Sequence, residues 1–290
     1  MVNKQISLII VTYESSGLIQ DCLDSVFQFN DINGGLEIIV VDNGSTDQVA
    51  LFEFIKSRYN EKVTCIASPG NTGYGAGNNL GVRHASSDRI VIMNPDVRMV
   101  EPVFAALLTF FEKNPDSGMV SVSFADESCP FFVKPEHHTI LNLMTFKFYV
   151  RSKQFNSRKM YLPGSFVMFD RAVFEQVGCF DEKIFLYFEE ADIATRIEKA
   201  GKKVRRIDNL HVFHLTHNRK LNERLLKVEI DSLAYYAAKF DFGVSKVLGY
   251  YLHVNRMKYF VALILRNPVK AAFFRTWIRL IKAKLHETNH

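Results

Sequence analysis

The residues in this sequence best suited to chemistry include the tripeptide Asn94-Pro95-Asp96, which closes the apolar run at residues 90–93. Because Pro95 lacks an amide hydrogen and has a fixed φ, a strand must end there and Asp96 must turn outward. A carboxylate at the carboxyl end of a buried strand lies where open α/β sheets bind ligands, and hard divalent cations prefer oxygen ligands. The tripeptide is therefore a candidate metal and diphosphate site, with a solvated turn as the alternative.

A second acidic segment, Glu189-Glu190-Ala191-Asp192, follows an aromatic run at residues 185–188. Acids in the first turn of a helix complement the helix dipole, which would explain them without chemistry. Neighbouring aromatic side chains would lower the local polarity, raise a carboxyl pKa and make one acid a better proton acceptor. Adjacent Glu189 and Glu190 point in different directions, so only one is expected to face a substrate. Asp192 can pair with Arg196 on the same helix face.

Histidines follow the predicted last strand, residues 203–207, at positions 211 and 214. A lone histidine is more often structural than a ligand. His214 is the candidate to complete a metal site with Asp96, and His217 is a second choice.

Polar residues also follow the earlier strands. Thr12-Tyr13 follows the first, and Asp42 follows the second, where its carboxylate can accept hydrogen bonds from a nucleobase or ribose. Its structural alternative is capping of the next helix. The loop at residues 71–79 is glycine-rich and opens a helix, an arrangement that lets backbone N–H groups approach a phosphate, with a plain turn as the alternative. It falls short of a dinucleotide motif because Asn78 replaces the third glycine.

These segments must be positioned by alternating strands and helices. Apolar runs predict strands at residues 6–11, 36–41, 63–67 and 89–93, and helical patterns lie at residues 17–29, 47–58 and 75–85. This alternation predicts right-handed βαβ units and a parallel sheet that binds ligands at its carboxyl edge. Further patterns predict helices at 102–113, 170–177 and 191–199, strands at 119–124 and 161–169, and helix from residue 221 onward. Residues 126–159 have no assignment, and Gly201 is placed to end a helix.

Composition narrows the class of protein. With 290 residues and 48% hydrophobic content, the chain can bury a large core. The four cysteines form no CxxC pair, which is typical of a reducing cytoplasm. No signal peptide is visible, and the apolar run at residues 259–265 is too short to span a bilayer.

The net charge of +5 is concentrated in the carboxyl-terminal segment, where residues 243–290 hold nine Lys or Arg and one acid, Glu287. On a helical wheel, residues 268–285 place Val269, Phe273, Phe274, Trp277, Ile278, Leu280, Ile281 and Leu285 on one half and Arg275, Arg279 and Lys282 on the other. A basic amphipathic helix suits the surface of an anionic bilayer. Packing on its own domain or on a second subunit, as in a homodimer, is the alternative. No nucleic-acid recognition motif accompanies the charge, so no nucleic-acid partner is expected.

Taken together, the motifs resemble the family 2 glycosyltransferases, particularly the bacterial rhamnosyltransferase-like branch. The resemblance runs from about residue 6 to residue 214. It rests on six segments: Val11-Thr12-Tyr13, Val41-Asp42-Asn43-Gly44-Ser45, Asn71-Thr72-Gly73-Tyr74-Gly75, Asn94-Pro95-Asp96, Gly178-Cys179-Phe180-Asp181-Glu182 and Phe185-Leu186-Tyr187-Phe188-Glu189-Glu190. The resemblance implies an α/β fold of the GT-A type, a Rossmann-like, mostly parallel sheet flanked by helices, with a helical carboxyl-terminal extension. It implies a glycosyltransferase domain at residues 1–220, with a nucleotide-sugar half (1–100) and an acceptor half (101–220), and an extension at 221–290.

The resemblance also implies roles for residues. Asn94-Pro95-Asp96 takes the place of the family's DxD motif, so Asp96, with His214, would hold Mg²⁺ or Mn²⁺ on the donor diphosphate. The nucleotide-sugar site would comprise Thr12, Tyr13, Asp42, Asn71, Gly73, Asn78, Asn94 and Asp96. Glu190 falls where the family has its general base, and Glu189 is the alternative, because the family commonly has Glu-Asp here. Asn94 in place of an acid leaves Asp96 as the main carboxylate ligand.

The expected reaction is inverting, metal-dependent transfer of a hexosyl group to a glycan, with dTDP-rhamnose as the first choice of donor and UDP-glucose or UDP-galactose as alternatives. The expected acceptor is a polyprenyl-diphosphate-linked O-antigen or other surface-polysaccharide intermediate. A peripheral position on the inner face of the cell membrane would follow from such an acceptor and from the basic helix. A sugar-nucleotide pyrophosphorylase is disfavoured, because Thr12-Tyr13-Glu14-Ser15-Ser16 replaces the basic glycine-rich loop of those enzymes. A non-catalytic scaffold is disfavoured because both acidic segments are filled.

Overall fold

The computed structural model describes residues 4–125, 130–152, 154–215 and 222–288. These residues form two compact units. One is drawn from Met1–Phe132, Tyr149–Lys183 and Glu189–His217, and the other from Val133–Phe148, Ile184–Phe188 and Asn218–His290. The division into residues 1–100, 101–220 and 221–290 remains a prediction from the sequence.

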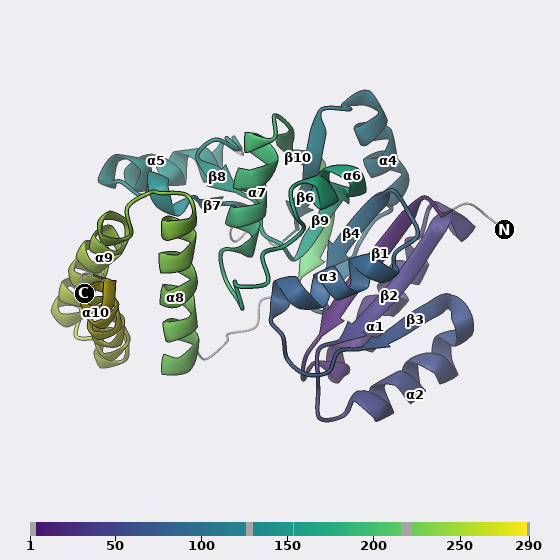
Figure 1. Ribbon diagram of the computed structural model, residues 1–290, viewed down its shortest axis with the longest axis horizontal. Helices are drawn as coiled ribbons and strands as arrows, with labels where there is room; N and C mark the ends of the chain where they lie inside the picture. The colour runs from purple at the N-terminus through teal and green to yellow at the C-terminus, as the bar shows by residue number, and fades with distance from the viewer. Residues whose placement is uncertain (1–3, 126–129, 153, 216–221, 289–290) are drawn as a thin grey trace. The chain divides into compact units, whose positions relative to one another are not determined.

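The first unit is built on an eight-stranded sheet in the order β3-β2-β1-β4-β9-β6-β10-β5 (Figure 1). Its strands are β1 (Ile6–Thr12), β2 (Leu36–Asp42), β3 (Val63–Ala67), β4 (Arg89–Met93), β5 (Val97–Met99), β6 (Ser117–Phe124), β9 (Phe166–Asp170) and β10 (Lys203–His214). The first four strands pair in parallel, which confirms the predicted parallel sheet. β9 lies antiparallel between β4 and β6, and β5 is antiparallel to β10. The short strands β7 (Phe132–Val133) and β8 (Met160–Tyr161) form a separate sheet.

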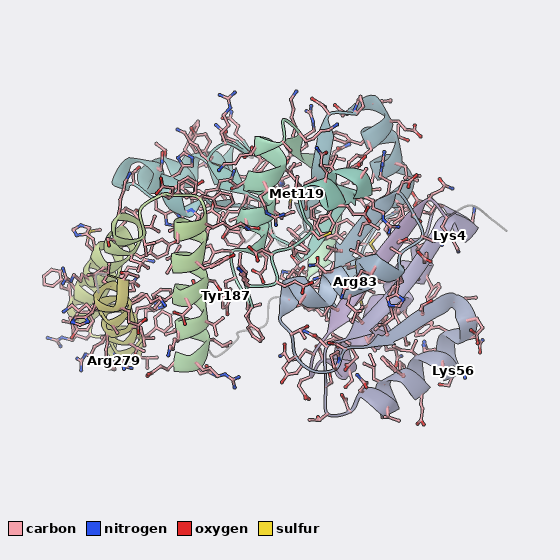
Figure 2. All side chains as sticks on the ribbon, viewed as in Figure 1. Lys4, Lys56, Arg83, Met119, Tyr187 and Arg279 are labelled. Atoms are coloured by element: carbon pink, nitrogen blue, oxygen red, sulfur yellow. The ribbon has the colours of Figure 1, made fainter. Side chains whose placement is uncertain are left out.

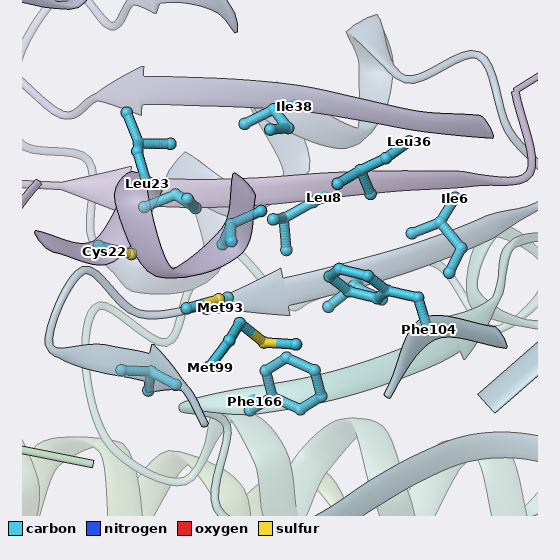
Figure 3. Packing of buried hydrophobic residues seen from close by; sticks show 14 of the residues in the cluster. Ile6, Leu8, Cys22, Leu23, Leu36, Ile38, Met93, Met99, Phe104 and Phe166 are labelled. Atoms are coloured by element: carbon cyan, nitrogen blue, oxygen red, sulfur yellow. The ribbon is translucent and has the colours of Figure 1, made fainter. Parts of the chain in front are cut away.

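Helices cover both faces of the main sheet, and the alternation of side chains in the strands explains why. In β1, Ile6 and Leu8 join one buried cluster, shown in Figure 3, whereas Ile9 joins a second cluster on the opposite face. The first cluster is closed by α1 (Ser16–Gln28), α2 (Gln48–Tyr59) and α4 (Phe104–Lys113). The second is closed by α3 (Tyr74–His84), α6 (Arg171–Gln176) and α7 (Glu189–Lys199). A central strand buried on both sides needs a nearly continuous apolar sequence, which β1 has at residues 8–11.

The glycines of α3 bring this helix close to the sheet. A Cβ atom at Gly81 would overlap the side chain of Ile9, and one at Gly77 would press on Val11. Close packing of helix on sheet therefore accounts for part of the glycine content that the sequence suggested for phosphate binding.

Three segments differ from their predicted boundaries or assignment. β10 extends to His214 rather than ending near residue 207, so His211 and His214 lie within the strand and do not follow it. Antiparallel pairing of residues 212–214 with β5 stabilises this extension. The strand predicted at residues 161–169 begins only at Phe166. Part of the unassigned segment forms α5 (Ile140–Arg151), while Gly201 does end α7 as predicted, with a φ of 77°.

The second unit contains three successive helices, α8 (Glu223–Lys239), α9 (Val244–Ile264) and α10 (Pro268–Thr288), which confirms the predicted helical segment. α10 packs on α8 and α9. Trp277 and Ile281, from the apolar half of the predicted amphipathic helix, are buried in this unit. Part of the apolar half of α10 therefore packs within its own unit, which was the alternative to a membrane-facing helix. None of the helices among the described residues is both long and apolar enough to cross a bilayer.

Candidate functional site

The Asp96 carboxylate and the His214 imidazole meet beyond β4, as the sequence predicted. The Oδ1 atom of Asp96 lies 3.3 Å from Nε2 of His214, and the backbone N–H of Leu215 donates to the Asp96 carbonyl at 2.8 Å. Asp96 is buried, whereas the His214 side chain is partly exposed and packs against Phe124. A carboxylate and an imidazole at one point are a suitable pair of ligands for a divalent cation.

An arginine that the sequence argument did not single out holds the turn that carries Asp96. Nη1 of Arg98 donates to the carbonyls of Pro95 (2.7 Å) and Val97 (2.9 Å), and Nη2 donates to the carbonyl of Leu18 (3.1 Å). These bonds fix the chain on both sides of Asp96 to the start of α1. Arg98 is therefore a structural support for the site.

Thr12 and Asp42 are register partners at the carboxyl ends of β1 and β2. Both are fully buried. The Oδ1 atom of Asp42 accepts hydrogen bonds from the N–H groups of Gly44 (3.1 Å) and Ser45 (2.8 Å) and from the Gln48 side chain (2.9 Å). Its Oδ2 atom is buried without a hydrogen-bond partner among the described residues. Asp42 thus shapes the turn before α2 and retains an acceptor for a further donor.

The register of β1 and β4 relates this pair to Asp96. β2 pairs in parallel with β1, and β1 pairs in parallel with β4, so Asp42 and the Asn94–Asp96 turn lie at the same carboxyl edge of the sheet, two strands apart. Tyr13, by contrast, is about half exposed.

Asn43 connects the glycine loop to β2. Its Nδ2 atom donates to the carbonyl of Gly73 (3.0 Å) and to the Oδ1 atom of Asn71 (3.3 Å), and its Oδ1 atom accepts from Thr72. In the first turns of α3, Asn78 is fully buried and donates to the carbonyl of Tyr74, while its own Oδ1 atom has no partner among the described residues. The loop is thereby held beside the Asp42 turn.

The Glu190 side chain lies against Gly164, the residue two positions before β9. The backbone N–H of Gly164 donates to Oε1 of Glu190 at 3.0 Å. A Cβ atom at Gly164 would overlap the same carboxylate, so only glycine leaves room for it. Burial raises the pKa of Glu190, as the sequence predicted, and the Gly164 N–H partly opposes this rise.

Glu189 has a different environment. It is buried, and both this burial and the neighbouring Glu190 charge raise its pKa well above the ordinary value. Asp192 forms the predicted pair with Arg196, whose Nε and Nη2 atoms donate to Oδ2 at 2.8 and 2.5 Å. The acidic segment therefore contains one structural ion pair and two carboxyl groups with raised pKa values.

The residues immediately before α7 have strained backbones. Tyr187 and Phe188 have φ angles of 73° and 68° (Tyr187 is labelled in Figure 2). Residues with a Cβ atom rarely adopt this left-handed backbone conformation. Each such residue costs about 1–3 kcal/mol and persists only where surrounding contacts enforce it. Such strain is concentrated at functional sites, and here it adjoins Glu189 and Glu190.

Residues 164 and 165 connect the two acidic segments. The N–H of Asn94 donates to the carbonyl of Ser165 at 2.9 Å, next to Gly164, which holds Glu190. The Tyr74 hydroxyl donates to the carbonyl of Gly164 at 2.8 Å. The pKa of Tyr74 is raised mainly by burial and further by the charges of nearby Glu190, Glu189 and Asp96. Both acidic segments thus lie within electrostatic range of one phenol.

The candidate metal ligands fit a divalent cation that phosphate oxygens of a bound nucleotide would help to hold. Among the described residues, no three His, Cys, Asp or Glu side chains cluster as metal ligands. Asp96 and His214 supply two ligands, and Mg²⁺ sites are commonly completed by one or two protein groups together with phosphate oxygens and waters. His211 takes no part, because its backbone N–H and Nδ1 atom contact Glu101. His217 lies outside the described residues.

Sequence reasoning missed Asn43, Tyr74, Arg98, Gly164 and Ser165 as parts of this arrangement. Asn43 and Tyr74 belong to segments that resemble family motifs, so their position was a usable signal. Gly164 follows Pro163 and precedes a buried strand, but its role depends on Glu190, 26 residues away. Arg98 acts through carbonyl groups, which leave no trace in the side-chain pattern.

Comparisons with known proteins identify the family and the fold. Residues 7–178 match the model of the family described as glycosyl transferase family 2. The low-salt glycan biosynthesis hexosyltransferase Agl10 of Haloferax volcanii is 25% identical over 75% of this chain and 68% of its own length. The N-acetylglucosaminyl-diphospho-decaprenol L-rhamnosyltransferase of Mycobacterium tuberculosis is 26% identical over 57% of this chain and 62% of its own length. Rhamnosyltransferase WbbL of Escherichia coli is 24% identical over 59% of this chain and 72% of its own length.

Among solved structures, the mannosyltransferase PcManGT of Pyrobaculum calidifontis, in complex with GDP-Man and Mn²⁺, superposes with a TM-score of 0.63 at 18% identity, covering 98% of this chain and 86% of that one. GalNAc-T7 with UDP, GalNAc and Mn²⁺ has a TM-score of 0.61 at 14% identity, covering 83% of this chain and 51% of that one. These likenesses establish the GT-A fold. Because the family model matches more than half of the sequence, this chain belongs to glycosyl transferase family 2.

Proposed function

We propose that this glycosyltransferase moves a sugar from a nucleotide diphosphate donor to a glycan acceptor with inversion at the anomeric carbon, with Glu190 as the base and Asp96 and His214 as metal ligands. The observation that carries the proposal is the connection through residues 164 and 165. It ties Glu190 to the turn that bears Asp96, so adjacent residues hold the proposed base and the proposed diphosphate site, which supports their acting together.

Glu190 is favoured over Glu189 as the base. Glu189 is buried, and both this burial and the neighbouring Glu190 charge raise its pKa well above the ordinary value, which disfavours the ionised form that a base requires. Glu190 is partly exposed, and the Gly164 N–H stabilises its ionised form. A raised pKa closer to the working pH also makes Glu190 a more effective proton acceptor than an ordinary carboxylate.

In the proposed step, a Glu190 oxygen takes the proton of the acceptor hydroxyl as that oxygen bonds to the anomeric carbon. The bond from the anomeric carbon to the diphosphate breaks on the opposite face, and the electron pair leaves with the nucleotide. A bound Mg²⁺ or Mn²⁺ would supply positive charge for the leaving diphosphate, so no acid need protonate it. Asp42, through its unpartnered Oδ2 atom, and Thr12 would hold the nucleoside, with Tyr13, Asn71, Gly73, Asn78 and Asn94 as the further donor-site residues.

The donor proposed first is dTDP-rhamnose, with a UDP-hexose as the alternative. Two relatives are named rhamnosyltransferases and one a hexosyltransferase, which supports either donor. Uracil and thymine present the same pairing edge to Asp42, so the base alone does not decide between them. The mycobacterial relative's name includes a diphospho-decaprenol acceptor, which supports a polyprenyl-linked glycan and work at the inner face of the cell membrane.

A thermal-shift panel tests the donor. The full chain is heated with Mn²⁺ and, in turn, dTDP-rhamnose, UDP-glucose, UDP-galactose and GDP-mannose. A ligand at 100 times its Kd stabilises the folded state by about 2.7 kcal/mol, so the true donor should raise Tm and the others should not. Incubation of that donor with a polyprenyl-diphosphate-linked acceptor should then give a product of inverted anomeric configuration by NMR. Retained configuration, or no response to any nucleotide sugar, would contradict the proposal.

A further inference from the structure

The turn between α9 and α10 exposes a cluster of apolar side chains, which we call the α9–α10 tip (residues 256–270). Met257, Phe260, Val261 and Ile264 recur at the spacing of a single helix face, and Leu265 and Val269 continue the cluster. Ile264, Leu265 and Val269 are 64%, 71% and 78% exposed. Contiguous exposed apolar side chains of this kind mark interaction surfaces, because isolated ones are common but clusters are costly in water.

The exposure is not due to a poorly formed core. On the opposite side of α9, Asn255 and Ala262 are buried, and α10 buries Ala271, Trp277 and Ile281. The helical pair therefore has an inward face that packs within its own unit and a separate outward face at the tip.

Basic side chains at the tip accompany the apolar ones. Arg256, Arg266 and Lys270 are exposed, and none of them forms an ion pair within the part of the chain that the structure describes. Two cations further along α10 do form ion pairs: Arg279 (labelled in Figure 2) pairs with Glu223 at 2.6 Å, and Lys284 pairs with Asp231 at 2.6 Å. Three cations without an ion pair among the described residues thus accompany the exposed apolar cluster at the tip.

The backbone of the turn is ordered around an arginine in an unfavourable conformation. Arg266 has a φ of 50°, at a helix end where glycine or asparagine is preferred. Its N–H donates to Leu263 and that of Asn267 donates to Ala262, while the Asn267 side chain caps α10 by accepting from Lys270. A charged side chain thus occupies a position where glycine would be less strained, and such backbone outliers are concentrated at functional sites.

We propose that the α9–α10 tip docks on an anionic lipid bilayer, with Phe260, Ile264, Leu265 and Val269 inserting among the head groups and Arg256, Arg266 and Lys270 contacting lipid phosphates. Apolar side chains beside cations are the combination that binds peripherally to such surfaces. A second copy of the chain is a poorer occupant, because it would bring the same unpaired cations into contact. The inference deepens the proposed work at a membrane by naming the contacting surface, and it is independent of the chemistry of transfer.

Vesicle flotation of the full chain tests the inference. The vesicles contain phosphatidylcholine alone or a mixture with phosphatidylglycerol, without polyprenyl lipid, so the acceptor cannot cause binding. One variant combines Ile264→Ser, Leu265→Ser and Val269→Ser, and a second combines Arg266→Gly with Lys270→Gln. The matched charge control combines Lys246→Gln with Lys282→Gln, two exposed cations outside the tip.

Wild type and the control are expected to float with the mixed vesicles and not with phosphatidylcholine alone. The serine variant should lose at least tenfold in the vesicle partition coefficient, and the charge variant roughly fivefold for each cation removed. Arg266→Gly relieves the left-handed conformation, so the charge variant should keep or raise Tm, and lost binding cannot be ascribed to unfolding. Absence of flotation by wild type, or equal losses in tip and control variants, would overturn the inference. So would a dimer in gel filtration that only the tip variants dissociate.

The flotation test and the tests of the proposed function can succeed or fail independently. Donor-induced thermal shift and transfer to a water-soluble acceptor need no vesicle, so they can succeed when flotation fails, and the reverse can also be observed.

Discussion

The Glu190 carboxylate lies in the space that any side chain at residue 164 would occupy, and it accepts the Gly164 N–H at 3.0 Å. The absence of a side chain at one residue thus determines where the carboxyl group of another can lie. Glycine is needed at residue 164 for room, since no left-handed φ is involved.

Gly164→Ala is expected to displace Glu190 and lower kcat by about 100-fold, because an error of about 1 Å in a catalytic group can cost that much. Steady-state kinetics with the donor selected by the thermal-shift panel measure this. Gly17→Ala is the matched control, since a Cβ there meets nothing within 4 Å. An unchanged kcat in the residue-164 variant would show that the carboxylate position does not matter.

Glu190→Gln should lower kcat by about 10²–10⁴-fold, the usual contribution of a general base, while donor binding is retained. Glu189→Gln should keep most of the activity and raise Tm, because it removes a carboxyl group whose ionised form is disfavoured by burial. Parallel kinetics and melting curves of the two variants make the comparison. If the effects on kcat were reversed, Glu189 would be the base.

The pH dependence of kcat should reveal the raised pKa of Glu190. A base works only when deprotonated, so kcat should fall as the pH drops through this pKa, and the acidic limb should lie above the ordinary value of 4.5. The profile is measured over a range in which circular dichroism shows an intact fold. An acidic limb at or below pH 4.5 would contradict a Glu190 carboxyl group whose pKa is raised by burial.

Removal of metal ligands should weaken the response to Mn²⁺. Asp96→Asn and His214→Ala are each expected to raise the Mn²⁺ concentration needed for half-maximal activity by at least tenfold, with the larger effect at Asp96, because a carboxylate supplies charge as well as a lone pair. Chelator treatment followed by Mn²⁺ titration gives this value. His211→Ala is the control, because His211 contacts Glu101 instead. Equal sensitivity of all three variants would exclude the pair as ligands.

The stability of the second unit should depend on Glu229, a residue of α8. Burial raises its pKa to about 7, and Lys258 partly opposes this. The folded state then favours the neutral acid, so this contribution to stability is fully present below the unfolded pKa of about 4.5 and is lost as the pH rises to about 7. Glu229→Gln should therefore stabilise the protein at pH 8 by at most about 3 kcal/mol, and little at pH 4.5. Urea denaturation at the two pH values tests this. A pH-independent difference would contradict it.

The alternating part of the fold was predictable because its signals are local. Each of β1 to β4 is an apolar run, and the helices between them follow the expected spacing. The position of β9 between β4 and β6 was not predictable, because a strand's partners depend on pairing across more than 70 residues. The length of β10 was missed for the same reason, since β5 is needed to stabilise its last residues.

The positions of the candidate residues were predictable where they lie at or just beyond the carboxyl ends of strands. Asp96 lies beside His214, and Thr12 lies beside Asp42, although His214 is the last residue of β10 and does not follow the strand; the roles of these residues stay predictions. The residues that support the site were not predictable. Arg98 donates to backbone carbonyl groups, and Gly164 acts through its backbone N–H and through its lack of a side chain. Such interactions depend on backbone positions that side-chain identity does not encode.

The adjacent residues Gly164 and Ser165 set a fixed spacing in the molecule. One holds the Glu190 carboxylate and the other holds the chain at Asn94, so the two attachment points are separated by one peptide unit, about 3.8 Å between Cα atoms. A peptide unit cannot stretch. Any movement of the start of β9 must therefore carry the carboxylate and the Asn94 turn together, and a one-residue insertion between residues 164 and 165 would separate them while leaving both side chains intact.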